Sequence, residues 1–284
     1  MNANLPQKTP VISTWLHNAT IQLVGAGIGS AKLDAEIMLA HTLRKNRTYL
    51  HAHGDAALTD RQAEVADARL QLRLDRTPIA YIIGHKEFYG RLFRVTPATL
   101  IPRPESETII TLLSEMISKN SSLLPTAPQQ LVDVGTGSGC LGITAKLEIP
   151  ELEVTLLDIS RHALTVAEYN AKKLGATVAA HYSDLLSNYP LRADFIVANL
   201  PYVDTTWLRS PETNYEPQTA LFAAEGGLHL IKRLIGQAEA HLSPHGSLLL
   251  EADPRQHAEI VTIAKSNGYS KREIRDFIIV LQKD

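Results

Sequence analysis

The sequence predicts an α/β fold, in which a mostly parallel sheet carries helices on both faces and follows a small helical domain and a β-hairpin linker. Two observations predict this class. Apolar, strand-like segments alternate with helical stretches in the second half of the chain, at residues 131–134, 153–157, 194–198 and 246–251. That alternation is typical of parallel sheets with helical crossovers. Residues 10–75 instead show helical spacing throughout. We therefore expect a helical domain at 1–77, a hairpin linker at 78–104 and the sheet domain at 105–284.

Two helices of the first domain have recognisable starts. Residues 30–43 carry Leu33, Ile37 and Ala40 at helical spacing, and Ser30 is placed to cap this helix. A second helix is expected to begin after Thr59, whose hydroxyl can accept a hydrogen bond from the first turn.

The linker is expected to form strands. Residues 79–83 and 91–95 are rich in strand-forming side chains and flank residues 84–90, which suggests a hairpin. Pro102 and Pro104 then stiffen the chain before a helix expected from Glu105 to Lys119. Residues 120–130 contain prolines and serines and are predicted to be a loop.

Composition narrows the functional classes. A hydrophobic fraction of 44% and a charged fraction of 20% indicate a soluble globular protein. No apolar run is long enough to span a bilayer, and no secretory signal core is visible. The single cysteine, Cys140, excludes an internal disulfide and fits a cytoplasmic protein. A net charge of −2 argues against nonspecific nucleic-acid binding, although residues 1–94 hold 12 Lys/Arg against 8 Asp/Glu. No His, Cys or Asp cluster has metal-ligand spacing, so no metal is expected.

A glycine turn follows the first predicted strand of the sheet. Residues 131–139 run from an apolar strand into Gly135-Thr136-Gly137-Ser138-Gly139 and then a helix. Glycines permit a tight turn and close backbone approach to a ligand. The dinucleotide fingerprint would need a glycine where Cys140 stands. The turn is therefore a candidate binding loop of another kind, with a purely structural loop as the alternative.

Acidic residues follow the next two strand-like segments. A carboxylate at Asp158 can accept both hydroxyls of a ribose. An acceptor at Asp184 can take an adenine amine, and the adjacent Leu185 is included in this predicted site. Each position has an ordinary alternative, because Asp158 can cap the following helix and Asp184 can be a turn residue. Their order at successive strand ends favours a nucleoside ligand.

Asn199-Leu200-Pro201-Tyr202 follows a buried strand and is the candidate reaction centre. Pro201 ends the strand pairing and biases Leu200 toward an extended backbone, which directs the Leu200 carbonyl outward. That carbonyl and Asn199 Oδ1 can hold the two hydrogens of a planar NH2 group, while the Tyr202 ring packs on its plane. An ordinary turn is the alternative.

The order of these motifs resembles the class I S-adenosylmethionine-dependent methyltransferases, which have a Rossmann-like sheet. Nearly the whole chain is similar to the PrmC/HemK family, which methylates the glutamine of the Gly-Gly-Gln loop in peptide-chain release factors. The resemblance rests on residues 84–88, 99–107, 133–139, 199–202, 215–217, Glu251 and Gln256. The Pro-Arg-Pro-Glu segment at 102–105 is the most family-specific part.

The resemblance implies S-adenosylmethionine as cofactor, bound by the glycine turn, Asp158, Asp184, Leu185 and Asn199. It implies transfer of a methyl group to an amide nitrogen by a site that works through orientation and electrostatics. Asn199, Leu200, Pro201 and Tyr202 would then be catalytic and bind the substrate. It implies a release factor as partner, contacted by residues 1–77. Direct nucleic-acid or membrane contact is not expected, and we expect a monomer.

Several further roles remain open at this level. Phe88 can form a wall of the substrate pocket or belong to the hairpin core. Arg103 can bind the substrate loop or pin the linker to the sheet domain, and pinning is favoured. Residues 215–217 can close over the site or cap a helix. Cys140 is expected to be a packing residue rather than a nucleophile.

The sequence departs from the family pattern at three places. Leu200 replaces the usual proline, Asp253 stands where glycine is usual, and residues 276–282 lack the usual Gly…Arg loop. These changes put substrate fit and turnover in question, but not the cofactor fold.

Two competing functions follow from the same residues. Asn-Leu-Pro-Tyr also resembles the ribosomal RNA adenine dimethyltransferases, so an adenine amino-methyltransferase acting on nucleic acid is the alternative. Against it stand the N-terminal position of the extra domain and the negative net charge. The third hypothesis is a cofactor-binding protein without catalysis.

Overall fold

The computed structural model describes residues 10–120 and 128–284, so most of the expected loop at 120–130 lies outside the described residues. Contacts divide the chain into two units. The helical unit comprises the chain up to Gly84 together with Pro211–Tyr215. The sheet unit comprises His85–Ser210 and Glu216–Asp284. The residue boundaries of the three domains expected from the sequence stay a prediction.

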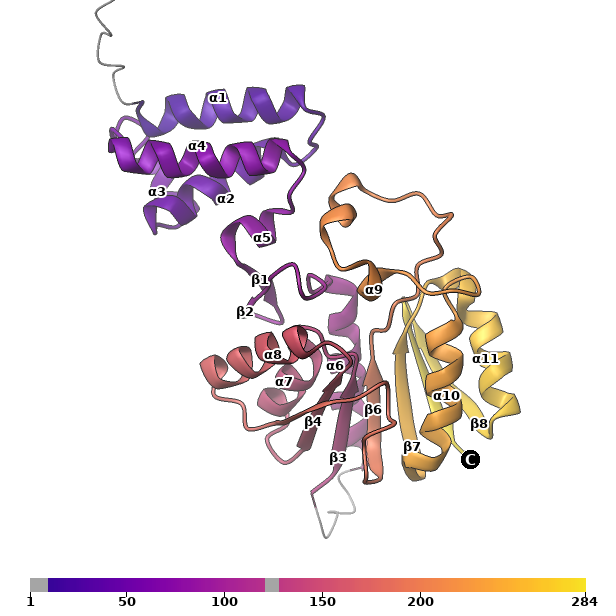
Figure 1. Ribbon diagram of the computed structural model, residues 1–284. Helices are drawn as coiled ribbons and strands as arrows, with labels where there is room; N and C mark the ends of the chain where they lie inside the picture. Colours follow the sequence, from indigo (N-terminus) through magenta and orange to yellow (C-terminus); the bar gives the residue numbers. More distant parts are fainter. Residues whose placement is uncertain (1–9, 121–127) are drawn as a thin grey trace, which may run out of the picture. The chain divides into compact units, whose positions relative to one another are not determined.

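The helical unit has its own hydrophobic core (Figure 1). Its helices are α1 (Ile12–Gly25), α2 (Ala31–Leu43), α3 (Arg47–Ala52), α4 (Asp60–Leu74) and α5 (Ile79–Ile83). Trp15, Leu23, Met38 and Leu50 are buried among them. The Trp15 indole also donates a hydrogen bond to Asp67 at 2.7 Å, which ties α1 to α4.

Helix starts were predicted better than helix faces. Thr59 caps α4 in a reciprocal box with Gln62, as expected. Ser30 precedes α2 as expected, but its hydroxyl donates to Asp34 instead of accepting from the backbone. Of the three residues whose spacing predicted this helix, Ala40 is buried and Ile37 is partly buried, whereas Leu33 is 42% exposed. Helix α2 contacts α1, α3, α4 and α5, so nearly all of its sides are covered and no single stripe marks its core face.

Residues 79–83 form helix α5 and not the expected strand. Pro78 precedes the helix, and Gly84 ends it with a left-handed φ of 77°. Ile79 and Ile82 pack against the core of the helical unit. Five apolar residues are too short a run to distinguish a helix from a strand by period, which explains the wrong prediction.

The hairpin forms, but from a different first strand. It pairs β1 (His85–Phe88) with β2 (Arg91–Arg94). The two turn residues, Tyr89 and Gly90, both have positive φ, at 50° and 74°. This is the backbone that two-residue hairpin turns require.

A seven-stranded sheet forms the centre of the sheet unit, in the order β5-β4-β3-β6-β7-β9-β8. The strands are β3 (Gln130–Val134), β4 (Glu153–Asp158), β5 (Ala179–Tyr182), β6 (Ala193–Ala198), β7 (Leu242–Glu251), β8 (Tyr269–Arg275) and β9 (Ile278–Lys283). The first five in this order are parallel, while β9 runs antiparallel to its neighbours. The four strands expected from the sequence are confirmed. The order reverses between β3 and β6, where open α/β sheets bind their ligands.

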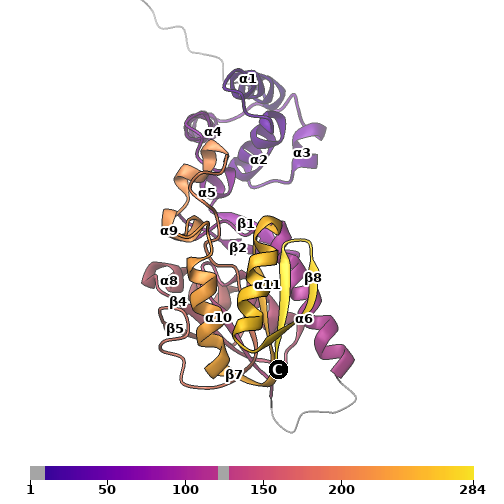
Figure 2. The ribbon, with the colours of Figure 1, turned by 90° about the vertical axis from the view of Figure 1, so that its right-hand side faces the viewer.

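Helices cover both faces of this sheet (Figures 1 and 2). Leu131 and Leu249 face one hydrophobic cluster with α6 (Glu107–Asn120), α7 (Cys140–Glu148) and α8 (Arg161–Leu174). Val132 and Leu248 face the other, with α10 (His229–His241) and α11 (His257–Ser266). Short helical turns complete the described chain: η1 (Pro104–Ser106), η2 (Pro211–Tyr215), α9 (Gln218–Leu221) and η3 (Pro254–Gln256). Adjacent strand residues thus alternate between two cores, as a sheet buried on both faces requires.

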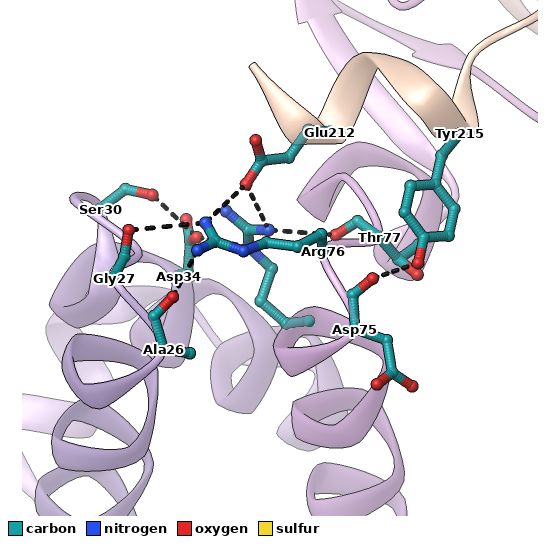
Figure 3. Close-up of polar contacts among 10 residues, drawn as sticks. Ala26, Gly27, Ser30, Asp34, Asp75, Arg76, Thr77, Glu212 and Tyr215 are labelled. Carbon is teal, nitrogen blue, oxygen red and sulfur yellow. Dashed lines mark hydrogen bonds and ion pairs between the residues drawn. The ribbon is translucent and has the colours of Figure 1, made fainter.

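A segment from far along the chain, η2, completes the helical unit (Figure 3). Glu212 bonds to the guanidinium groups of Arg73 at 3.0 Å and Arg76 at 3.5 Å. Arg73 is buried and also pairs with Asp34 at 2.7 Å. The Tyr215 hydroxyl donates to the Asp75 carbonyl. Two arginines are thereby balanced by two carboxylates, one of them contributed by η2.

Candidate active site

A cavity of about 610 Å³ lies in the sheet unit at the carboxyl ends of β3, β4 and β6. Its volume is within the usual range for small-molecule sites. Most of the site residues predicted from the sequence line it: Gly135, Thr136, Gly137, Ser138, Asp158, Asp184, Leu185, Asn199, Leu200 and Pro201. The topology therefore brings together motifs that are separated by more than sixty residues in the sequence.

The glycine turn needs glycine for two different reasons. Gly135, Gly137 and Gly139 all have φ between 56° and 81°, a region that other residues rarely adopt. A Cβ at Gly135 would also lie 2.8 Å from Leu200 Cδ2, and one at Gly139 would lie 2.5 Å from Ile143 Cδ1. At Gly137 a Cβ would meet nothing within 4 Å, so its backbone conformation is the constraint there.

The Asp133 side chain holds the glycine turn in place through two hydrogen bonds. Its Oδ2 accepts hydrogen bonds from the Thr136 hydroxyl at 2.6 Å and from the Gly142 backbone at 2.9 Å. Burial raises the pKa of Asp133 to about 6, against the opposing effect of these hydrogen bonds. Asp133 Oδ1 has no hydrogen-bond partner among the described residues.

Asp158 accepts a hydrogen bond from the glycine turn and also lines the cavity. Its two oxygens accept from the backbone N–H groups of Gly137 at 2.9 Å and Ser160 at 2.8 Å. The N-cap of α8 is Ser160, not Asp158. Burial raises the pKa of Asp158, and the backbone hydrogen bonds lower it. Each carboxylate oxygen keeps a second lone pair, so Asp158 remains able to accept ligand hydroxyls.

Asp184 and Leu185 lie at another part of the cavity wall. Asp184 is paired with Arg233 at 2.7 Å, and both side chains line the cavity. Leu185 has a left-handed φ of 52°, which is unusual for a branched side chain. Their contact with an adenine stays a prediction.

A buried chain of hydrogen bonds supports Asn199. Its Nδ2 donates to Ser106 Oγ at 3.0 Å, and Ser106 donates to Glu251 Oε2 at 2.5 Å. Tyr202 donates its hydroxyl proton to Glu251 Oε1 at 3.1 Å. Burial raises the pKa of Glu251, while the hydrogen bonds from Ser106 and Tyr202 lower it. Burial and the neighbouring Glu251 raise the pKa of Tyr202, which keeps the phenol protonated.

The backbone after Asn199 is fixed by Gln256. Its Nε2 donates to the Tyr202 carbonyl at 2.8 Å and to the Gly226 carbonyl at 2.7 Å. A Cβ at Gly227 would lie 1.9 Å from the Tyr202 oxygen, so glycine is required there. Asp253 has φ −64° and forms a capping box with Gln256, so this position does not need the usual glycine.

Three predicted substrate contacts lie outside the cavity wall. Phe88 is 1% exposed and packs edge-on against Phe93, so its ring belongs to the hairpin core. The Tyr202 ring is partly buried against the sheet core. Arg103 pairs with Glu216 at 2.6 Å, and Glu216 also accepts from the Ile101 backbone at 3.1 Å. This ion pair agrees with the pinning role favoured from the sequence, and the substrate contact of Arg103 stays a prediction.

Sequence reasoning missed other members of the wall. Ser106, which lines the cavity, and Glu251, which does not, lay inside recognised motifs but had received no role. Further residues line the cavity: Ala98, Thr99, Leu100, Pro102, His162, Thr219, Phe222 and Leu230. The motif at 99–107 was the available signal for Thr99, Leu100, Pro102 and Ser106, whereas nothing in the local sequence distinguishes His162, Thr219, Phe222 and Leu230. Burial raises the pKa of the Cys140 thiol to about 12, which keeps it uncharged as a packing residue.

Within residues 10–120 and 128–284, no group of three or more His, Cys, Asp or Glu side chains is placed to hold a metal ion. No helix in those ranges is long and apolar enough to cross a membrane.

Comparisons with known proteins agree with this geometry. Residues 14–84 match the family model of the PrmC N-terminal domain, and residues 111–210 match the methyltransferase small domain. A release factor glutamine methyltransferase of Koribacter versatilis is 39% identical over 84% of this chain and 86% of its own length. One of Salmonella typhimurium is 34% identical over 93% and 94%. The solved hMettl16 catalytic domain, bound to a hairpin of the MAT2A 3′UTR, is 16% identical with a TM-score of 0.52, over 80% of this chain and 81% of that chain. That last likeness concerns the fold alone. The extent of the curated matches, together with the two family models, shows that this chain belongs to the release factor glutamine methyltransferase family.

Proposed function

We propose that this protein transfers the methyl group of S-adenosylmethionine to the side-chain amide nitrogen of the glutamine in the Gly-Gly-Gln loop of peptide-chain release factors. The observation that carries the proposal is the position of Asn199, Leu200 and Pro201 on the wall of a cavity that also contains the glycine turn and Asp158. Family membership identifies the substrate class.

The chain's residues fit the cofactor. Gly135 and Gly137 present backbone without side chains to the cavity, and Asp158 keeps lone pairs for ribose hydroxyls. We assign Thr136, Ser138 and Asn199 to the same wall, and Asp184 with Leu185 to the adenine end. Gly139 belongs to the turn but does not line the cavity. When bound, the sulfonium of S-adenosylmethionine supplies an electrophilic methyl group.

The site acts on the glutamine mainly by orientation. An amide nitrogen is a weak nucleophile because its lone pair is delocalised into the carbonyl. Asn199 Oδ1 and the Leu200 carbonyl would accept its two hydrogens and leave the nitrogen facing the cavity. Both acceptors also stabilise the positive charge that develops on this nitrogen. Pro201 shapes the wall, and the Tyr202 backbone is fixed by Gln256.

The remaining expectations belong to the same proposal. The helical unit would contact the release factor away from the glutamine, consistent with the excess of Lys and Arg over Asp and Glu in residues 1–94. A cytoplasmic monomer fits the single cysteine and the small net charge. The nucleic-acid alternative is not favoured, because the curated relatives are named for release factor glutamine.

The decisive experiment measures transfer of labelled methyl from S-adenosylmethionine to a purified release factor. Asn199→Ala should reduce kcat by about 100-fold or more, because one of two aligned acceptors is lost. Asn267→Ala, at the end of α11 and outside the cavity wall, is the matched control and should leave transfer unchanged.

Replacing the acceptor glutamine by asparagine should abolish the signal. Transfer that persists in Asn199→Ala would refute the assigned chemistry. Transfer to ribosomal RNA in place of release factor would refute the assigned substrate.

A further inference from the structure

We propose that Ser106 and Glu251 are positioning residues, which set the orientation of the Asn199 amide so that its oxygen faces the substrate. The inference rests on the proposed function and adds the determinant that makes Asn199 an acceptor. It starts from the chain Asn199–Ser106–Glu251–Tyr202, in which every link is a hydrogen bond of 2.5 to 3.1 Å.

The chain is assembled from separate elements, and its two middle members are buried. Ser106 ends η1, Glu251 ends β7, and Asn199 follows β6 directly. Ser106 and Glu251 are each 1% exposed, so water does not compete for their hydrogen bonds. In such surroundings an unpaired donor or acceptor is costly, and each group must match the polarity of its neighbour.

Glu251 accepts a hydrogen bond from Ser106 on one carboxyl oxygen and from Tyr202 on the other, and this arrangement fixes the direction of the whole chain. Ser106 has a single hydroxyl proton, and it donates this proton in the hydrogen bond to Glu251. The Ser106 oxygen can then only accept from Asn199, which must present its NH2 group. The Asn199 oxygen is then at the other end of the planar amide group, away from Ser106.

This direction matters because the two ends of an asparagine amide have nearly the same shape. Packing alone distinguishes them poorly, and hydrogen-bond partners decide between them. With the amide reversed, Asn199 would present N–H donors to the N–H donors of the substrate glutamine. The reversed form would therefore be inactive. Without the Ser106 hydroxyl or the Glu251 carboxyl group that accepts from it, both orientations become populated.

The test uses the full-length protein with Ser106→Ala, Ser106→Thr and Glu251→Gln. Ser106→Ala should lower kcat about 10-fold while the Kd for S-adenosylmethionine changes less than twofold. Ser106→Thr keeps the hydroxyl and should restore kcat. Glu251→Gln should resemble Ser106→Ala, because a glutamine amide can donate to Ser106 and reverse the chain. Ser247→Ala is the matched control, since Ser247 is a buried serine that lies on β7, like Glu251, and does not line the cavity.

A second measurement reads the amide directly and needs no substrate. In protein labelled with ¹⁵N-asparagine, the Nδ2 protons of Asn199 are assigned by their loss in Asn199→Ala. They should exchange slowly in the wild type and in Ser106→Thr, and faster in Ser106→Ala. Unchanged exchange in Ser106→Ala would overturn the proposal. So would a Ser106→Ala variant that loses cofactor affinity in parallel with kcat, since that indicates a general structural role.

The kinetic measurement and the exchange measurement together separate this inference from the proposed function. If the wild type fails to methylate a release factor, the proposed function fails, and the exchange measurement still decides the orientation of Asn199. If the wild type is active and Ser106→Ala keeps its kcat within twofold, the positioning role fails alone.

Discussion

Asp133 shows how a single buried carboxylate shapes the cofactor turn without lining the cavity. It accepts from Thr136, which lies within the turn, and from the backbone of Gly142 in α7. Gly142 is itself constrained, because a Cβ there would lie 2.3 Å from Leu156 Cδ2 and 3.0 Å from Asp133 Cβ. The strand, the turn and the first helical turn of α7 are thus held through one side chain.

The raised pKa of Asp133 predicts a pH dependence of stability. A folded-state pKa of about 6, against 3.8 for an ordinary aspartate, means that the folded protein holds this proton more tightly than the unfolded chain. The stabilisation is fully present below the unfolded pKa and is lost as the pH rises through the folded pKa. Between pH 5 and 8, wild type should lose about 1 kcal/mol of unfolding free energy relative to Asp133→Asn, which does not titrate. Urea unfolding at both pH values measures the difference. A parallel pH profile for the two proteins would contradict the prediction.

Leu200 illustrates how a departure from the family pattern is accommodated. Its side chain is 4% exposed and packs where any substituent on Gly135 would lie. The residue after Asn199 thus also contacts the cofactor turn, which links the predicted acceptor site to the predicted cofactor site.

At the scale of elements, the sequence predicted those strands and helix starts that are determined by residues close together in the chain. The strands β3, β4 and β6 have apolar runs that end at polar residues, and the cap of α4 has a hydroxyl and a glutamine at fixed spacing. By contrast, α5 and the buried face of α2 depend on which neighbours cover them. The site shows the same division. The turn at 135–139 and Asn199 carry local signals, whereas Ser106 and Glu251 meet Asn199 only through the order of the strands.

The capping box of α4 gives a prediction at this scale. Thr59 accepts from the Gln62 backbone at 3.2 Å, and the Gln62 side chain accepts from the Thr59 backbone at 2.9 Å. Thr59→Ala removes the first bond and should destabilise the helical unit by about 1 kcal/mol. Thr59→Ser keeps the hydroxyl and is the matched control. Thermal unfolding followed by circular dichroism measures both. Equal stability of the two variants would show that the cap contributes little.

At the scale of the whole molecule, the chain passes between the two units more than once. It does so after Gly84, and again on either side of η2, which has five residues. The residue after η2 is Glu216, which is bonded to Arg103 and to the Ile101 backbone within the sheet unit. The segment that follows Asn199–Tyr202 is therefore held in the helical unit at one point and in the sheet unit at the next. Deleting residues 1–77 would remove the partners of η2 along with the helical unit, so point substitutions separate these effects more cleanly.

Glu212 is the residue to change. It supplies one of the two carboxylates that balance Arg73 and Arg76, and only 6% of the Arg73 side chain is exposed. Glu212→Ala leaves Asp34 alone against both arginines and should weaken the docking of η2 by about 1 to 2 kcal/mol. Backbone hydrogen exchange in residues 211–215 should then become about tenfold faster, while exchange in β3 and β6 stays unchanged.

Glu64→Ala is the matched control, because Glu64 forms an exposed pair with Arg61 on the surface of α4. If Glu212→Ala and Glu64→Ala leave η2 equally protected, the ion pairs do not hold the segment. If methyl transfer falls only in Glu212→Ala, with exchange at η2 raised, the helical unit contributes to turnover by restraining the segment that follows Asn199–Tyr202.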